Sequence, residues 1–164
     1  MNEHKIVDFL NNVVLYPWFF AIYPILFFYA HNVGEVSIKE ILLPIVCALF
    51  LSSILWFIIK LILKNSAKTG LMTTMFLLFF WGYGHVINLL EAKDIVILPH
   101  RHLQLIPGIL ILFCCLVFFT KISSLSFKAI TLPFNFIIAV LITINLYPIM
   151  SENLHGMQFP NQKL

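Results

Sequence analysis

Five long apolar stretches dominate the sequence and restrict the folds that it can adopt. They cover residues 13–30, 41–63, 71–90, 103–120 and 129–150. A helix needs about 20 apolar residues to cross roughly 30 Å of hydrocarbon, and every stretch meets or approaches that length. Only 10% of the residues are charged and 61% are hydrophobic, whereas a soluble domain carries about 25% charged residues. The sequence therefore predicts an integral membrane protein.

The stretches show no alternation of apolar and polar residues of the kind that a membrane β-barrel needs. A backbone in lipid must satisfy its own hydrogen bonds, which favours helices. We therefore expect an all-α membrane protein in which residues 1–164 form a single five-helix transmembrane bundle. Pro17 and Pro24 lie in the first stretch and indicate a bent or tilted span. The start of the chain is mixed in charge, unlike a secretory signal peptide, so the first span is expected to be retained.

The basic residues predict the orientation, because cytoplasmic loops hold the excess of lysine and arginine. With the N-terminus inside, the inner segments hold Lys5, Lys60, Lys64, Lys68, Lys121 and Lys128, and the outer segments hold Lys39, Lys93, Arg101 and Lys163. This six-to-four bias predicts an N-in, C-out topology. Short loops and lysine-rich inner segments are typical of a bacterial plasma (inner) membrane.

A polar hairpin, "WGYGHVINLLEAKDIVILPHRH" at residues 81–102, separates the third and fourth stretches. With the end of the first stretch it forms a predicted outer collar, which consists of His31, Tyr83, His85, His100, Arg101 and His102. The collar has a plain interpretation, because such side chains favour headgroup depth for their polar tips and apolar bodies. It also suits a lipid phosphate, since arginine has forked donors, and imidazoles leave a metal or catalytic site as a third interpretation.

Other polar residues lie within the apolar stretches. Gly82 and Gly84 predict a close helix contact, with His85 and Asn88 as hydrogen-bonding groups across it, and the alternative is a polar pocket that opens outward. Lys60 is expected to anchor the inner end of the second span.

Two asparagines of the fifth stretch, Asn135 and Asn145, are expected to hydrogen-bond between helices. Cys47, Cys114 and Cys115 lie in apolar runs and are expected to be free thiols.

Catalytic signatures are missing from the sequence. The apolar stretches contain no Asp or Glu, and there is no phosphate-binding glycine loop, GxSxG elbow, HExxH motif or zinc-type cysteine spacing. We therefore expect no catalytic residue, cofactor or metal ligand in this chain. The net charge of +3 is small and dispersed, which argues against a nucleic-acid partner.

Three segments resemble a known family. They are "WFFAIYPILFFYAHNVGEV" (18–36), "FFWGYGHVINLLE" (79–91) and "PHRHLQLIPGIL" (99–110), and they are similar to the N-terminal membrane region of sulfatase-like membrane proteins of the alkaline-phosphatase superfamily. In that family a five-helix membrane unit precedes an extracytoplasmic domain with a metal-bound nucleophile. Residues 151–164 leave no room for that domain. The resemblance therefore implies an anchoring or lipid-presenting role, with matching positions at Tyr83, His85, His100 and Arg101.

The leading hypothesis is a polytopic membrane anchor or lipid-headgroup-presenting subunit without chemistry of its own. Its expected partners are a membrane lipid, an extracytoplasmic sulfatase-like or transferase protein acting in trans, and further copies of the chain. One alternative is a small transporter or channel subunit, whose polar path would contain Ser52, Ser53, Asn88, Asn135, Thr143 and Asn145. A third hypothesis, an intramembrane transferase that uses the outer histidines, lacks a nucleophile.

Overall fold

The structure, a computed structural model, describes residues 12–92 and 101–158. Within these residues the chain is helical and contains no strand. The elements are α2 (Tyr16–His31), α3 (Ile38–Leu63), α4 (Ser66–Ala92), α5 (Arg101–Ile122), the 3-10 helix η1 (Lys128–Ile130) and α6 (Thr131–Gln158). The prediction of an all-α chain is confirmed for the described residues.

Four of the helices are long and apolar enough to cross a membrane, judged by length and composition. They are Ile38–Leu63, Ser66–Leu89, Leu105–Ile122 and Lys128–Ser151. Large apolar side chains remain exposed along them, such as Leu43 at 71% and Phe50 at 64% on α3. Apolar surface on this scale is unfavourable in water and suits hydrocarbon. The fold is therefore that of a membrane-type helical bundle.

The first apolar stretch is helical but shorter than predicted. Helix α2 has 16 residues, about 24 Å at 1.5 Å per residue, and it is not among the four helices of spanning length. The residues before it are held in a non-helical form by Asn135, whose Nδ2 donates to the carbonyl of Val13 at 2.6 Å and whose Oδ1 accepts from the amide of Tyr16 at 2.8 Å. The stretch predicted over residues 13–30 is thus helical from Tyr16 to His31, and its crossing of the membrane stays a prediction.

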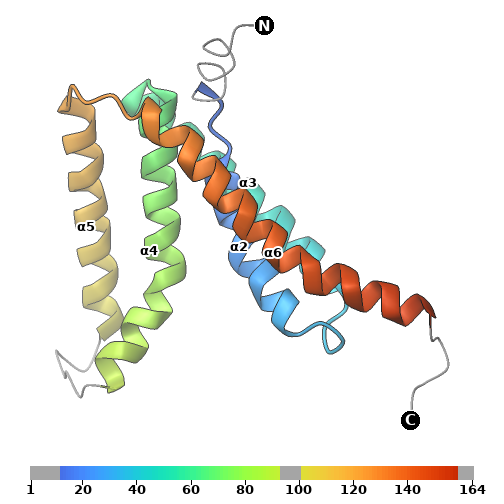
Figure 1. The fold of residues 1–164 in the computed structure, drawn as a ribbon. Helices are drawn as coiled ribbons and strands as arrows, with labels where there is room; N and C mark the ends of the chain where they lie inside the picture. Colours follow the sequence, from blue (N-terminus) through green and yellow to red (C-terminus); the bar gives the residue numbers. More distant parts are fainter. Residues whose placement is uncertain (1–11, 93–100, 159–164) are drawn as a thin grey trace, which may run out of the picture.

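Helix α2 lies inside the bundle, where it contacts α3, α4 and α6. Its buried side chains are Tyr16, Pro17, Ala21, Leu26 and Tyr29. The helices run alternately in opposite directions, and α2, α3 and α6 diverge from α4 and α5 (Figure 1). Helix α5 packs on α4 and α3 at the periphery.

The two ends of the bundle differ in composition, and we name them by their side chains. The lysine end is where α3 and α5 finish and α4 and η1 begin, and it contains Lys60, Lys64, Lys68, Lys121 and Lys128. The histidine end is where α2 and α4 finish and α3 and α5 begin, and it contains His31 and His85.

Each end has its own apolar cluster. Leu26, Tyr29, Ile41 and Ile149 join α2, α3 and α6 near the histidine end. A second cluster joins α3, α4 and α5 near the lysine end and consists of Ile59, Leu63, Met72 and Val117. Helix α5 is therefore held mainly at its C-terminal half.

Two residues adopt a positive φ, and both lie in turns between helices. Gly34, with a φ of 96°, lies in the turn between α2 and α3. Lys64, with a φ of 53°, lies between α3 and α4 and is the only non-glycine residue of the described chain with a positive φ. A side chain in this conformation costs about 1–2 kcal/mol relative to ordinary backbone, so a lysine there is unusual.

Candidate functional site

The described members of the predicted collar do not lie together as one site. His31 is the last residue of α2 and is exposed, with its Nδ1 2.8 Å from the carbonyl oxygen of Phe27. His85 is exposed on α4, and Tyr83 is half-buried there. The end of α2 and the end of α4 lie on the two diverging parts of the bundle (Figure 1). His31 is therefore separate from Tyr83 and His85.

The remaining collar residues lie beside α4. Arg101 and His102 are the first residues of α5, and His100 lies outside the described residues. The start of α5 adjoins the end of α4 in the bundle (Figure 1). The part of the collar on α4 and α5 stays a prediction, with Tyr83 and His85 as its placed members.

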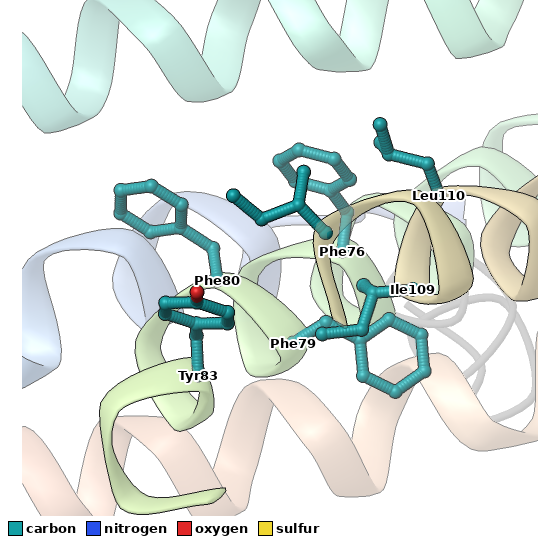
Figure 2. Close-up of a pocket in the computed structure, with 7 residues that line it drawn as sticks. Phe76, Phe79, Phe80, Tyr83, Ile109 and Leu110 are labelled. Carbon is teal, nitrogen blue, oxygen red and sulfur yellow. The ribbon is translucent and has the colours of Figure 1, made fainter. Parts of the chain in front are cut away.

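An apolar pocket of about 350 Å³ lies between α4 and α5 (Figure 2). It is lined by Phe76, Phe79, Phe80 and Tyr83 of α4 and by Ile106, Ile109 and Leu110 of α5. Apart from the Tyr83 hydroxyl, these side chains offer only hydrocarbon. A pocket of this kind suits an apolar chain.

The sequence carried a signal for this pocket. The four α4 residues follow i, i+3, i+4, i+7 spacing, which places them on one face of a helix. Which face forms a pocket depends on where α5 packs, and the spacing alone does not show that.

Two further pockets lie along α3, and only one of them adjoins the first. One, of about 320 Å³ between α2, α3 and α4, shares Phe76 and Phe80 with it. The other, of about 290 Å³ between α3 and α5, shares Leu55 and Ile58 with the second and is lined at one side by Lys121. Mainly apolar pockets therefore continue along α3 towards the lysine end.

The glycine contact predicted in the third span is not found among the described residues. A Cβ atom added to Gly82 or Gly84 would meet none of their atoms within 4 Å outside the adjacent backbone of α4, and His85 and Asn88 are exposed rather than packed. The close approach occurs instead at Gly70, where an added Cβ would collide with the side chains of Val14 and Tyr16.

Four of the six residues proposed for a polar transport path bond within their own helix, and Ser53 Oγ also accepts from Trp18 Nε1 of α2 at 2.9 Å. The hydroxyls of Ser52, Ser53 and Thr143 and the amide of Asn145 each donate to a carbonyl three or four residues earlier on the same helix. Asn135 binds the backbone at the start of α2. The expectation of interhelical bonding is confirmed for Asn135, whereas the described bond of Asn145 lies within α6.

Lysines join the helices at the lysine end. Lys60 Nζ donates to Ser66 Oγ at 2.6 Å and lies 5.6 Å from the ring centroid of Trp56. Lys68 Nζ donates to the carbonyls of Thr120 at 3.0 Å and Ser123 at 2.6 Å. Lys60, predicted as an interfacial anchor, thus connects the end of α3 to the start of α4, and Lys68 holds the end of α5.

Metal-binding groups do not gather in the described part of the chain. No three His, Cys, Asp or Glu side chains there are placed to hold an ion. Cys47, Cys114 and Cys115 are free and exposed, as predicted.

Comparison with known proteins adds no family to this picture: no protein-family model, curated protein or solved structure matches the chain. The fold and the pockets define a class, namely an all-helical bundle with four helices of membrane-spanning length. The resemblance to sulfatase-like membrane proteins remains a prediction from the residues quoted above.

Proposed function

We propose that the protein is a polytopic membrane anchor that holds a lipid between α4 and α5 and presents its headgroup at the histidine end. The observation that carries this proposal is the apolar pocket formed by Phe76, Phe79, Phe80, Tyr83, Ile106, Ile109 and Leu110. In this role the chain supplies binding and position, and any chemistry on the headgroup comes from a partner.

The chemistry around the pocket fits a phospholipid. Ile106 and Leu110 follow Arg101 by five and nine residues, about 8 and 14 Å along α5. A lipid whose phosphate lies near the start of α5 would therefore place its upper acyl chain in the pocket. The start of a helix favours anions, because its first amides have no intrahelical partners. The first turn of α5 contains no acidic residue that would compete.

The orientation is part of this proposal. Lys60, Lys64, Lys68, Lys121 and Lys128 gather at one end of the bundle, and the positive-inside rule assigns such an end to the cytoplasm. The pocket's headgroup side then faces outward, in a plasma membrane of bacterial type. A sulfatase-like or transferase domain supplied by another chain would meet the lipid on that side, as the family resemblance implies.

The decisive experiment tests occupancy of the pocket. The full chain is reconstituted with phosphatidylglycerol that carries a photoactivatable acyl chain, and the cross-linked peptides are mapped by mass spectrometry. We expect cross-links to α4 and α5, and Ile109→Trp, which fills the pocket, should remove most of them. Ile111→Trp is the matched control, since Ile111 is on the same helix and is 64% exposed. Equal cross-linking in both variants would contradict the proposal.

A second experiment tests the headgroup and the partner. Arg101→Ala and His85→Ala should reduce the preference for phosphatidylglycerol over phosphatidylcholine, whereas His31→Ala on the separate α2 should leave it unchanged. Purification from native membranes should also retain a sulfatase-like or transferase protein. If the lipid preference and the retained proteins are the same in wild type and variants, the collar is only an interfacial ring.

A further inference from the structure

A polar pocket of about 330 Å³ lies at the lysine end, away from the site proposed above. Its polar lining consists of Asn12, Lys60, Lys64, Asn65, Ser66 and Lys128. These residues come from the segment before α2, the junction of α3 with α4, and η1. The pocket exists only when these three parts of the chain meet, and it shares no residue with the α4–α5 pocket.

The charge of this pocket is unbalanced. Three lysines line it, and no acidic residue of the described part of the chain does so. Glu40 precedes Lys60 by twenty residues on α3, which is about 30 Å along the helix axis. Lysines brought together in this way repel one another and attract anions.

Hydrogen-bond donors supplement the three cations. Ser66 Oγ accepts from Lys60, which leaves the proton of its own hydroxyl to donate elsewhere. Ser66 is also the first residue of α4, whose first turn contains no acidic residue. The positive end of that helix therefore adds to the field in the pocket.

Lys64 lines this pocket and has a backbone conformation that is unfavourable for a residue with a side chain. Its φ of 53° is a conformation in which glycine is the favoured residue after a helix. Lys64 thus adds a third lysine to the pocket lining at a position where glycine would suit the backbone better.

We propose that this pocket binds the phosphate group of an anionic membrane lipid in the leaflet at the lysine end. Lys60 lies within the apolar helix Ile38–Leu63 and Lys64 directly follows it, so the pocket is at headgroup depth when α3 crosses the membrane. Basic pockets between helix ends at this depth bind anionic headgroups. The proposal is independent of lipid binding at the histidine end.

The test compares lipid retention by native mass spectrometry on the full chain in mild detergent. The probes are phosphatidylglycerol, zwitterionic phosphatidylcholine and inorganic phosphate. Lys64→Gly and Lys128→Gln should each weaken phosphatidylglycerol binding roughly fivefold, the effect of one lysine near an anionic surface. Lys64→Gly should leave the thermal stability unchanged or raised, because glycine suits the positive φ, so a loss of binding would not reflect unfolding.

Two lysines serve as matched controls. Lys121→Gln removes an equal charge at the same end but outside this pocket, and Lys39→Gln removes one at the opposite end. Both should change retention less than about twofold, since exposed charges are screened over about 10 Å. Equal losses of bound phosphatidylglycerol in all four variants would show that the lysines attract lipid only through a diffuse positive potential, which would overturn the proposal. Unchanged phosphatidylglycerol retention in Lys64→Gly and Lys128→Gln would overturn it as well. Stabilisation by inorganic phosphate alone, lost in the same two variants, would support the anion site and overturn its assignment to a lipid.

Discussion

The lysine end and the histidine end of the bundle use polar side chains in opposite ways. At the lysine end, Lys60 and Lys68 donate to groups on neighbouring helices or loops, and Tyr16 Oη donates to the carbonyl of Ala67 at 3.4 Å. At the histidine end, His31 bonds within its own helix and His85 is exposed. Polar residues therefore join helices at one end and remain on the surface at the other.

This difference between the two ends follows from the positions of helix-end carbonyl groups that lack a hydrogen-bond partner. Helices that finish side by side leave their last carbonyls unpaired, and Lys68 is placed to reach those at the end of α5. At the histidine end, α2 and α4 finish on diverging parts of the bundle (Figure 1). Side chains such as His31 and His85 are left exposed there. The lysine end is therefore held together by polar bonds between helices, whereas the polar side chains of the histidine end stay accessible.

Among the variants considered, Asn135→Ala is expected to lower the stability of the lysine end most. The side chain accepts from the amides of Leu15 and Tyr16 and donates to the carbonyl of Val13. Its removal leaves several backbone groups without partners, so we expect a loss of about 3 kcal/mol in unfolding free energy. The check is reversible unfolding in mixed micelles, with Asn88→Ala as the exposed control. A loss no larger than that of the control would mean that water replaces the asparagine.

Gly70→Ala and Gly82→Ala form a matched pair on α4. A methyl group at Gly70 collides with Val14 and Tyr16, whereas Gly82 has open space. We expect Gly70→Ala to destabilise by about 1–2 kcal/mol and Gly82→Ala to stabilise by up to about 1 kcal/mol through helix propensity. Thermal unfolding in detergent measures both. If both substitutions raised, or both lowered, the melting temperature, the contrast between a packed Gly70 and an open Gly82 would be wrong.

Lys68→Met tests the link between α4 and α5. It removes two hydrogen bonds to the end of α5, and we expect a local loss of about 1 kcal/mol. Hydrogen exchange in the last turn of α5 should accelerate by roughly fivefold, while exchange in α2 stays constant. Lys121→Met, an exposed lysine on that turn, is the control and should change exchange little. Faster exchange throughout the protein would indicate that Lys68 supports the whole bundle instead.

Much of the fold could be predicted from the sequence, because a long apolar run is a local property. The runs at 41–63, 71–90, 103–120 and 129–150 all lie within helices. The start of α2 depends partly on a distant residue. Pro17 in its first turn is a local signal, but Asn135 is separated by 120 residues from the amide of Leu15 that it binds.

The sites were less predictable, for a related reason. Gly70 and Gly82 look alike in the sequence, and only the position of α2 decides which one needs to be glycine. The lysines could be counted for orientation, yet their gathering around one pocket depends on three distant segments. The collar residues share a chemical type, but the ends of α2 and α4, which contain the described ones, lie on diverging parts of the bundle (Figure 1). Composition identifies the residue types at an end, and packing decides which of them meet.

The smallest effect on stability is expected at the histidine end. His31→Ala and His85→Ala should each change the unfolding free energy by less than about 0.5 kcal/mol, since both side chains are exposed. The loss for His31 is limited to one bond within α2 and its contact with the Phe27 ring, at 4.1 Å between centroids. Under the proposed function, His85→Ala should nevertheless reduce phosphatidylglycerol preference while His31→Ala does not. A marked loss of stability for His85→Ala would give that residue a packing role and remove the distinction between a joined end and an accessible one.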